Sequence, residues 1–389
     1  MQKRSRLLEF IKKETVLCIA VLLAGISAVI VPPDADYAGY IDFRTLAILF
    51  SLMSVMAGLQ KLGVFGWIAG KLLGKVKTSC SIILILVLLC FFFSMLITND
   101  VALITFVPFT FTVLDLLGKE QRKKLVLPVV AMQTVAANLG SMLTPIGNPQ
   151  NLYLYGKAGL SVGEFLGLML PYTVLSLVLL LVWGTIQGRV SQMEAKTEIF
   201  SGEKEPVWKE NSVQPGEAVR SLAVYLVLFV LCLLAVAHLL PWQAVLVIVF
   251  ATVFLMDRKV LAKVDYSLLL TFTGFFVFIG NMGRITVFRD FLQRIIAGRE
   301  VYTAIISSQV ISNVPAALLL SGFTENYKSL IVGTNLGGLG TLIASMASLI
   351  SYKYVAKEES GRKGEYIRIF TVGNICFLAV LIGLECFLS

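Results

Sequence analysis

Long apolar runs separated by short polar segments occupy the whole chain. Of the 389 residues, 57% are hydrophobic and 15% are charged, a balance outside the usual range of soluble domains. Apolar runs of about 20 residues, the length that crosses a bilayer, recur from near the N-terminus to the C-terminus. The pattern predicts an all-α polytopic membrane protein of the cell membrane, forming one domain in the lipid bilayer with about nine membrane-spanning helices.

Two apolar segments are broken in the middle by short polar sequences. T-N-D divides residues 81–117, which have lysine or arginine beyond both ends, and S-N divides residues 302–323. Each arm of the second segment has about ten residues and reaches about 15 Å, half of a bilayer core of roughly 30 Å. We therefore predict two re-entrant hairpins.

Residues 125–155 hold helix breakers inside an apolar segment. The sequence from Asn138 to Asn151 reads N-L-G-S-M-L-T-P-I-G-N-P-Q-N, and its prolines and glycines force a helix to open. Inside a membrane, freed backbone groups are tolerated only against other protein or a wet cavity. The segment is predicted to be an interrupted helix that lines a site, with a proline kink as the alternative. A weaker echo predicts a second interrupted helix at 325–352.

Basic residues beside the apolar runs set the predicted orientation. Five lysines and arginines in the first 13 residues place the N-terminus in the cytoplasm, and the crossings counted from there leave the C-terminus outside. A charged loop beginning at residue 187 divides the chain. We predict an N-terminal repeat at 1–186, a cytoplasmic loop and connector helix at 187–240, and a C-terminal repeat at 241–389.

Three sequence blocks occur in the same order in both halves. The first begins at Asp42 and at Asp265; the second pairs I-T-N-D-V-A-L-I with I-S-N-V-P-A-A-L; the third pairs the stretch from Asn138 with N-L-G-G-L-G-T-L-I-A-S-M-A-S from Asn335. Three matches in order indicate a repeat. The orientation places Asp42 outside and Asp265 inside, so we predict an inverted-topology repeat, a device that surrounds a solute at mid-membrane. Channels use the same parts, so a passive channel stays an alternative.

The net charge of +9 and the six cysteines change this picture little. The basic residues lie in short loops beside apolar runs and indicate topology, with no nucleic acid as partner. The cysteines lack the spacing of a metal site or a disulfide framework. No Walker loop, G-x-S-x-G, H-E-x-x-H or nucleotide fingerprint occurs in the sequence. We predict a protein that is not an enzyme, with no catalytic residue and no cofactor beyond Na+ or H+ as coupling ion.

The predicted site takes its chemistry from the hairpin tips and the helix breaks. Both tips pair a hydroxyl with an amide, which ordinary helix capping explains in part, but the repetition favours a solute or ion site. Asp100 is the one carboxylate expected near the membrane centre, where it binds Na+, carries a proton or caps its helix. The candidate Na+ ligands are Asn99, Asp100 and Asn148. All candidate solute- and ion-binding residues are Thr98, Asn99, Asp100, Asn138, Thr144, Gly147, Asn148, Asn151, Ser312, Asn313, Asn335, Thr341, Ser345 and Ser348.

The motifs at both tips and both breaks resemble the ion transporter superfamily. They are T-N-D-V-A-L-I-T-F-V-P at 98–108, the stretch at 138–151, S-N-V-P-A-A-L-L-L at 312–320 and G-T-N-L-G-G-L-G-T-L-I-A-S at 333–345. The superfamily includes citrate and dicarboxylate carriers, arsenite efflux permeases and some bacterial sodium/proton antiporters, and the resemblance covers nearly the whole chain.

In the carboxylate carriers, Ser-Asn-Thr at both tips and the broken helices bind substrate carboxylates and Na+. The resemblance also implies a homodimer and an elevator movement of the hairpin domain. In this chain the first tip reads Thr-Asn-Asp, closer to the arsenite and antiporter branches, and the second reads Ser-Asn-Val. The carriers' binding role is implied here for Thr98, Asn99, Ser312, Asn313, Thr144 and Thr341.

The sequence thus predicts an ion-coupled secondary transporter of a small anion, either citrate or another dicarboxylate or an inorganic oxyanion, working by alternating access with Na+ or H+. Without a Lys or Arg at mid-membrane, such an anion is held by helix dipoles, amides and hydroxyls. The alternatives are an arsenite or antimonite efflux permease, a sodium/proton antiporter and a passive channel.

Overall fold

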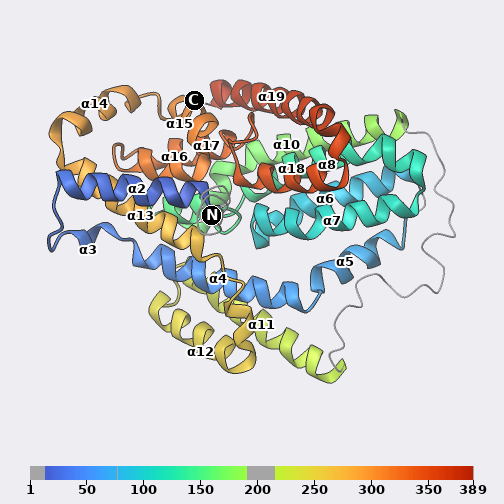
Figure 1. Cartoon of the computed structure of the whole chain (residues 1–389), viewed down its shortest axis with the longest axis horizontal. Helices are drawn as coiled ribbons and strands as arrows, with labels where there is room; N and C mark the ends of the chain where they lie inside the picture. Colours follow the sequence, from blue (N-terminus) through green and yellow to red (C-terminus); the bar gives the residue numbers. More distant parts are fainter. Residues whose placement is uncertain (1–13, 77, 191–214, 389) are drawn as a thin grey trace, which may run out of the picture.

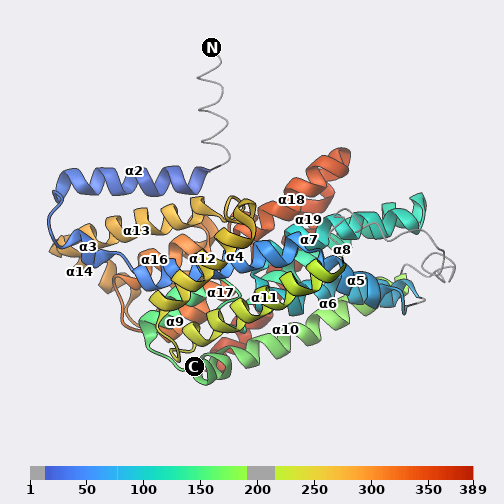
Figure 2. The same cartoon turned by 90° about the horizontal axis from the view of Figure 1, so that it is seen from below.

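The described part of the chain is helical throughout, with no strand among its residues. The computed structural model describes residues 14–76, 78–190 and 215–388 (Figures 1 and 2). Its helices are α2 (Thr15–Ile30), α3 (Tyr37–Tyr40), α4 (Phe43–Lys61), α5 (Val64–Leu73), α6 (Ser79–Ile97), α7 (Asn99–Leu116), α8 (Lys119–Ser141), α9 (Pro149–Ala158), α10 (Val162–Val190), α11 (Pro215–Val236), α12 (Trp242–Leu261), α13 (Tyr266–Arg284), α14 (Thr286–Ile296), α15 (Glu300–Ile311), α16 (Asn313–Ser321), α17 (Tyr327–Leu336), α18 (Met346–Glu358), the short 3₁₀ helix η2 (Ser360–Arg362) and α19 (Lys363–Leu388).

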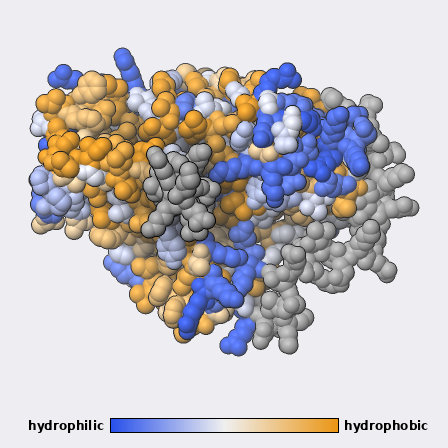
Figure 3. All heavy atoms as spheres, viewed as in Figure 1, coloured by the Kyte–Doolittle hydropathy of each residue, from blue (hydrophilic) through white to orange (hydrophobic). Residues whose placement is uncertain are grey.

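Many of these helices are long and apolar enough to cross a membrane. In the described residues, α4, α6, α7, α10, α11, α13 and α19 meet both conditions. Helix α2 is apolar but has 16 residues, and α12 carries three charges near its end, from Asp257 to Lys259. Apolar side chains cover much of the face in Figure 3, as a lipid-facing surface requires. The prediction of an all-α polytopic membrane protein is confirmed. The described residues hold seven such helices where about nine were expected, and two of the seven, α6 and α7, are the arms of the first predicted hairpin.

The two segments predicted to be hairpins each form two helices around a single tip residue. Helices α6 and α7 have 19 and 18 residues, and Thr98 joins them. Helices α15 and α16 have 12 and 9 residues, which gives lengths of about 18 and 14 Å, and Ser312 joins them. The arms of the first segment are thus long enough to span a membrane, whereas those of the second are not.

The two segments predicted to be interrupted helices are each divided as expected. Helix α8 ends at Ser141 and α9 begins at Pro149; α17 ends at Leu336 and α18 begins at Met346. The first break contains Pro145 and Gly147, and Pro149 occupies the first turn of α9, where a missing N–H costs nothing. The sequence therefore located both breaks.

The first block of the sequence repeat begins two helices in the same way. Asp42 accepts a hydrogen bond from the Thr45 amide (3.0 Å) before α4, and Asp265 accepts one from the Leu268 amide (2.9 Å) before α13. The two aspartates have nearly the same backbone angles, φ −79° and ψ 82° against φ −77° and ψ 82°. An identical N-cap at matched positions supports the repeat, while the opposite orientation of the two copies stays a prediction.

Other boundaries differ from the expectation. Helix α10 continues to Val190, past the expected start of the charged loop at 187, and α19 begins at Lys363 instead of 367. The polar segment after α2 contains the short helix α3, which the sequence did not indicate. Most of the predicted charged loop, residues 191–214, lies outside the described residues.

Helix α8, which ends at the first break, is surrounded by other helices. It packs against α6, α7, α10, α18 and α19, while α4 packs against α11 and α12 on the opposite side of the molecule from α19 (Figure 1). Gly140 allows the closest approach: a Cβ atom there would lie 1.9 Å from the Phe91 carbonyl oxygen of α6. The end of α8 is thereby fixed against the first hairpin.

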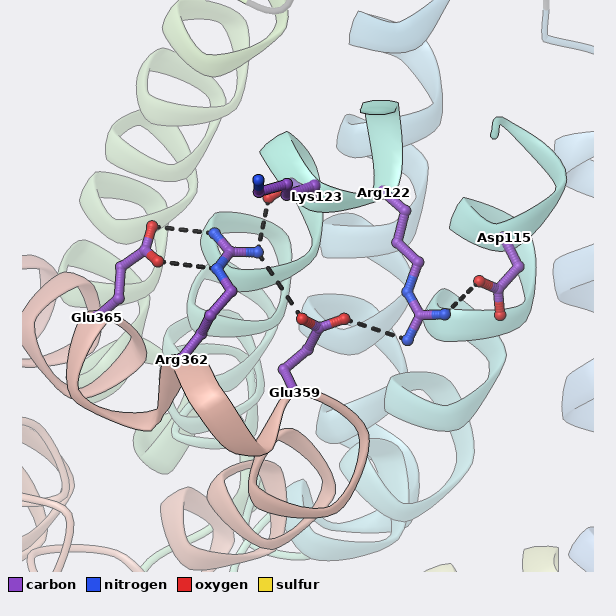
Figure 4. Close-up of polar contacts among 6 residues, drawn as sticks. All are labelled: Asp115, Arg122, Lys123, Glu359, Arg362 and Glu365. Carbon is purple, nitrogen blue, oxygen red and sulfur yellow. Dashed lines mark hydrogen bonds and ion pairs between the residues drawn. The ribbon is translucent and has the colours of Figure 1, made fainter. Parts of the chain in front are cut away.

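A chain of alternating charges joins α7 and α8 to the start of α19 (Figure 4). Its links are Asp115–Arg122 (2.5 Å), Arg122–Glu359 (3.1 Å), Glu359–Arg362 (3.8 Å) and Arg362–Glu365 (2.8 Å), and Arg362 also donates to the Lys123 carbonyl (2.7 Å). These contacts tie the ends of the first hairpin and of both interrupted helices together.

Candidate functional site

Both hairpin tips have a backbone conformation that is unusual for residues with a side chain. Thr98 has φ 69° and ψ 152°, and Ser312 has φ 73° and ψ 154°. Such angles belong almost only to glycine and cost about 1–3 kcal/mol for other residues. Two hairpins that carry the same strain at matched positions indicate that the tips are held in place by their surroundings.

Matched hydrogen bonds fix each tip to its own helix break. The Asn99 amide donates to the Gly147 carbonyl (3.2 Å), and the Asn313 amide donates to the Ala344 carbonyl (2.9 Å). Three residues before each carbonyl stands a threonine, Thr144 or Thr341. These contacts give both copies the same tip-to-break geometry.

The two threonines bind the hairpin arms. Thr144 donates to the Met95 carbonyl (2.5 Å), and Thr341 donates to the Gln309 carbonyl (3.2 Å), each three residues before its tip. The Thr341 side chain is exposed, and its amide donates to the Gln309 side chain (2.9 Å). The structure thus places both predicted site threonines where they support the tips.

Asn138 connects the two halves of the chain. Its Oδ1 accepts from Asn99 Nδ2 (3.0 Å) on the first tip and from Ser345 Oγ (3.0 Å) at the second break. Its Nδ2 lies 3.4 Å from Ser348 Oγ and 3.5 Å from the Gly338 carbonyl oxygen. The Asn138 side chain is 5% exposed, so both halves share a buried polar contact.

A second group of amides joins the same breaks. Asn335 donates to Asn151 Oδ1 (2.7 Å), and Asn148 donates to Ser141 Oγ (2.7 Å) and lies 3.5 Å from Asn335 Oδ1. Ser141 Oγ in turn donates to the Asn138 carbonyl (2.9 Å), which links this group to the first. We call the whole set the asparagine network; it consists of Asn99, Asn138, Ser141, Asn148, Asn151, Asn335, Ser345 and Ser348.

Four helices begin at the asparagine network or directly beside it. They are α7 and α16 behind the tips, and α9 and α18 behind the breaks. A helix N-terminus presents free N–H groups and a partial positive charge, so it attracts anions. In the described part of the chain, no lysine or arginine side chain is bonded to the network. Any anion there is bound by amides, hydroxyls and helix ends.

Asp100 lines a cavity that lies beside the network. The cavity has a volume of about 180 Å³ and is bounded by α4, the first tip, the first break and the residues before α13. The Asp100 carboxylate accepts no hydrogen bond from the described residues, so the alternative of a helix cap finds no support. The polar side chains of the lining are Gln60, Thr98, Asp100, Lys263 and Asp265.

The three candidate Na+ ligands lie around this cavity and the first break. Asn99 and Asp100 are consecutive, and Asn148 precedes Pro149, which lines the cavity. Asn99 Oδ1 already accepts from the Asp100 amide (2.9 Å), and the Asn148 amide group donates into the network. Among the described residues, no three His, Cys, Asp or Glu side chains form a metal-binding group. Asp100 thus offers a carboxylate that accepts no hydrogen bond from the described residues, whereas the Asn99 oxygen is already engaged.

The second tip contributes mainly backbone contacts. Ser312 Oγ lies 3.4 Å from both the Ala344 carbonyl oxygen and Asn313 Oδ1. Gly338 lies next to the Asn313 side chain, because a Cβ atom there would be 3.1 Å from Asn313 Nδ2. Ser312 and Asn313 thus adjoin the second break, although their side chains are not bonded to Asn138.

Two residues missing from the predicted set belong to the site region. Gln150, in the first turn of α9, is fully buried, and neither polar atom of its amide has a hydrogen-bond partner among the described residues. The sequence places it in the polar stretch that lines the first break, although it is not among the predicted binding residues. Gln309 donates to the Gly337 and Leu339 carbonyls (3.0 and 2.9 Å) and so holds the second break. Because it lies within an apolar hairpin arm, the sequence did not indicate its role.

The fold is that of a polytopic membrane protein, and comparison with known proteins shows that the chain is a membrane transporter. Residues 7–327 match the citrate transporter family (CitMHS), so the chain belongs to this family. The resemblance of its motifs to the ion transporter superfamily is confirmed.

Relatives cover most of the chain. The inner membrane protein YbiR of Escherichia coli is 32% identical over 339 residues, which are 85% of this chain and 86% of that protein. The uncharacterized transporter MJ0456 of Methanocaldococcus jannaschii is 31% identical over 346 residues, 88% of this chain and 89% of that protein. The uncharacterized transporter Rv2684 of Mycobacterium tuberculosis is 24% identical over 374 residues, 85% and 84% of the two chains.

Proposed function

We propose that the protein is a secondary transporter that carries a small anion by alternating access, coupled to Na+ or H+. The observation that supports this most is Asn138, whose side chain joins the first tip to the second break. A solute held at this point contacts both halves of the chain. In alternating access, the two halves of a transporter move against each other around the solute, so the binding site has to lie between them.

The chemistry of the asparagine network favours an anion. Four helix N-termini and a set of neutral amides and hydroxyls offer hydrogen-bond donors without a fixed positive charge. Citrate is the solute named by the family, and dicarboxylates and inorganic oxyanions share its need for donors. Gln150 adds a buried amide with free donors and acceptors at the same break. The proposed substrate is therefore citrate, a dicarboxylate or an inorganic oxyanion.

Asp100 is proposed to carry the coupling ion. It lines the 180 Å³ cavity together with Thr98 at the first tip, and its carboxylate makes no hydrogen bond to the described residues. The corresponding position at the second tip is Val314, so coupling rests on the first copy alone. A bound Na+ or proton neutralises this carboxylate, which removes a charge from beside the anion.

A second candidate is export, either of arsenite or antimonite or of Na+ against H+. The cavity beside the first tip favours the exchange of Na+ against H+, because two carboxylates, Asp100 and Asp265, line a space with one lysine, Lys263. An acidic lining attracts cations and repels anions. A passive channel is the third possibility, since channels can be built from similar parts.

Flux measurements in proteoliposomes separate these functions. We expect citrate, succinate or sulfate to accumulate when an inward Na+ or H+ gradient is imposed, and not without one. Anion flux that ignores both gradients contradicts coupling and indicates a channel. Na+ or arsenite efflux without anion uptake supports the second candidate instead.

The role of Asp100 has its own variant. Asp100→Asn should abolish the gradient dependence. Asp290→Asn changes an exposed aspartate that pairs with the adjacent Arg289, and it should leave the gradient dependence unchanged. Gradient dependence that survives in Asp100→Asn contradicts the coupling role.

A further inference from the structure

A groove runs between α10 and α19 on the outer surface of the helix bundle. Its floor is formed where Trp183 lies on Gly373: a Cβ atom at Gly373 would be 2.6 Å from Cη2 of the indole. The Trp183 ring also packs against Phe377, with the ring centroids 5.8 Å apart. Only a glycine lets the indole approach the helix this closely, so the indole lies against α19 and forms part of the groove wall.

The groove has a volume of about 440 Å³ and one charged group. Six of its lining residues are apolar, weakly polar or glycine, and the seventh is an arginine with an exposed guanidinium. The lining consists of Trp183, Arg368, Ile369, Val372, Gly373, Cys376 and Phe377.

Its surroundings are typical of a lipid-facing surface. Val182, Val372 and Ile375 are 51%, 57% and 55% exposed. Helix α10 ends at Val190 and α19 begins at Lys363. Trp183 and Arg368 therefore lie about 10 and 8 Å inside these helix ends, the depth at which tryptophan and arginine meet lipid headgroups.

Arg368 lies near a carboxylate, Glu365, that Arg362 already holds in an ion pair. Arg362 is occupied by Glu365 and Glu359, as Figure 4 shows. The charges of Arg368 and Lys123 also act on the Glu365 carboxylate, so both cations lie near it. Among the described residues, Arg368 forms no ion pair. A cation that no carboxylate of the described residues contacts directly, above an apolar groove, matches an anionic head with an acyl chain.

We propose that this groove binds one anionic phospholipid, with its phosphate against Arg368 and an acyl chain along Trp183, Gly373 and Phe377. A zwitterionic lipid also fills the apolar part but gains less from Arg368. One arginine near an anionic lipid surface contributes about 1 kcal/mol, which corresponds to roughly a fivefold preference. The groove shares no residue with the asparagine network or with the cavity beside Asp100.

Tryptophan fluorescence offers a direct test. A variant with Trp67, Trp208 and Trp242 replaced by Phe keeps Trp183 as its only tryptophan. It is placed in bilayers with brominated phosphatidylglycerol or brominated phosphatidylcholine, and quenching of Trp183 gives the relative binding constant. We expect the anionic lipid to bind about fivefold more tightly.

Two arginine variants decide whether the preference belongs to this groove. Arg368→Gln should bring the ratio of the two binding constants close to one. Arg294→Gln, which removes an exposed arginine on α14, should leave the ratio unchanged. A wild-type ratio near one, or a ratio unaffected by Arg368→Gln, overturns the proposal.

Native mass spectrometry tests the same point on the full chain, should the single-tryptophan protein fail to fold. We expect retained phosphatidylglycerol to be lost in Arg368→Gln and in Val372→Trp, which fills the groove. A second copy of the chain as occupant is checked through Cys376, an exposed thiol of the groove, in a Cys386→Ser background. Cross-linked dimers through Cys376 that form regardless of lipid overturn the proposal.

Discussion

The contact that joins the two halves gives the sharpest prediction. Asn138→Leu keeps the size of the side chain but removes the acceptor shared by Asn99 Nδ2 and Ser345 Oγ, each 3.0 Å away. Both partners are buried, and neither side-chain donor has another acceptor among the described residues. The variant therefore leaves two donors unsatisfied inside the protein.

The cost follows from those two donors. An unsatisfied buried donor costs about 1–3 kcal/mol, so the pair costs about 2–6 kcal/mol. Because the entropy of unfolding grows with chain length, 1 kcal/mol shifts Tm by roughly 1–2 °C in a chain of this size. We expect Asn138→Leu to lower the Tm of the detergent-solubilised protein by about 2–12 °C and to impair transport.

Asn374→Leu is a matched control. Asn374 is fully buried in α19, its Nδ2 donates only to the Phe370 carbonyl of its own helix (2.8 Å), and its Oδ1 has no partner among the described residues. Leucine there removes an unsatisfied acceptor and should leave Tm unchanged or higher. A fall in Tm that is no larger for Asn138→Leu than for Asn374→Leu refutes the reasoning.

A double-mutant cycle isolates the Asn138–Ser345 contact. Ser345→Ala alone should lower Tm, because it removes a bonded hydroxyl. In the Asn138→Leu protein the same change removes a donor that is already unsatisfied, so it should restore part of the loss, with a coupling of about 1–3 kcal/mol. Additive shifts would show that the two residues do not share this bond in the folded protein.

Three further variants test other parts of the structure. Gln150→Leu should keep or raise Tm, because the buried amide of Gln150 has no hydrogen-bond partner among the described residues to lose. The same change should raise the half-saturating anion concentration about tenfold. A lower Tm contradicts the expected effect on stability. Arg122→Gln breaks both ion pairs that Figure 4 shows for this arginine and should lower Tm by a few degrees. Arg289→Gln should not lower it, and equal shifts for the two variants would show that the chain of charges does not stabilise the protein. Burial and, to a lesser extent, the Arg44 guanidinium lower the pKa of His238. The unfolded chain therefore takes up the proton first, and the stability of the folded protein should fall as the pH drops below about 6.5. In His238→Asn the Tm should depend less on pH between pH 5 and 7.

The sequence predicted the positions at which helices break. It did not predict which residues those breaks contact. Glycine, proline and asparagine inside apolar runs are local signals, so the tips and both breaks fell at the expected residues. Asn138 meets Ser345 and Ser348, which are 207 and 210 positions away. No pattern along the chain specifies such a distant contact, and the repeat showed only that the two breaks are related.

Side-chain contacts add what the sequence could not show. Thr144 and Thr341 are predicted to bind solute, which stays a prediction, and each also donates to a carbonyl of the hairpin arm beside it. Gln309 was overlooked because one polar residue in an apolar arm reads as an ordinary surface position. Its three hydrogen bonds to the second break become visible only when the arm and the break are placed together.

The two halves have the same backbone conformation at their tips but different side chains there. This difference affects how the binding of two ligands could be coupled. The matched tip conformations and tip-to-break bonds give each half the same backbone frame. The first half adds Asp100 and Gln150, whereas the second offers Asn335, Ser345, Ser348 and backbone carbonyls. A cation at Asp100 and an anion at the asparagine network would then occupy adjoining places on one tip. Each lowers the electrostatic cost of binding the other, which is the energetic requirement for symport. The same adjacency explains why Asp100→Asn should separate anion binding from the ion gradient.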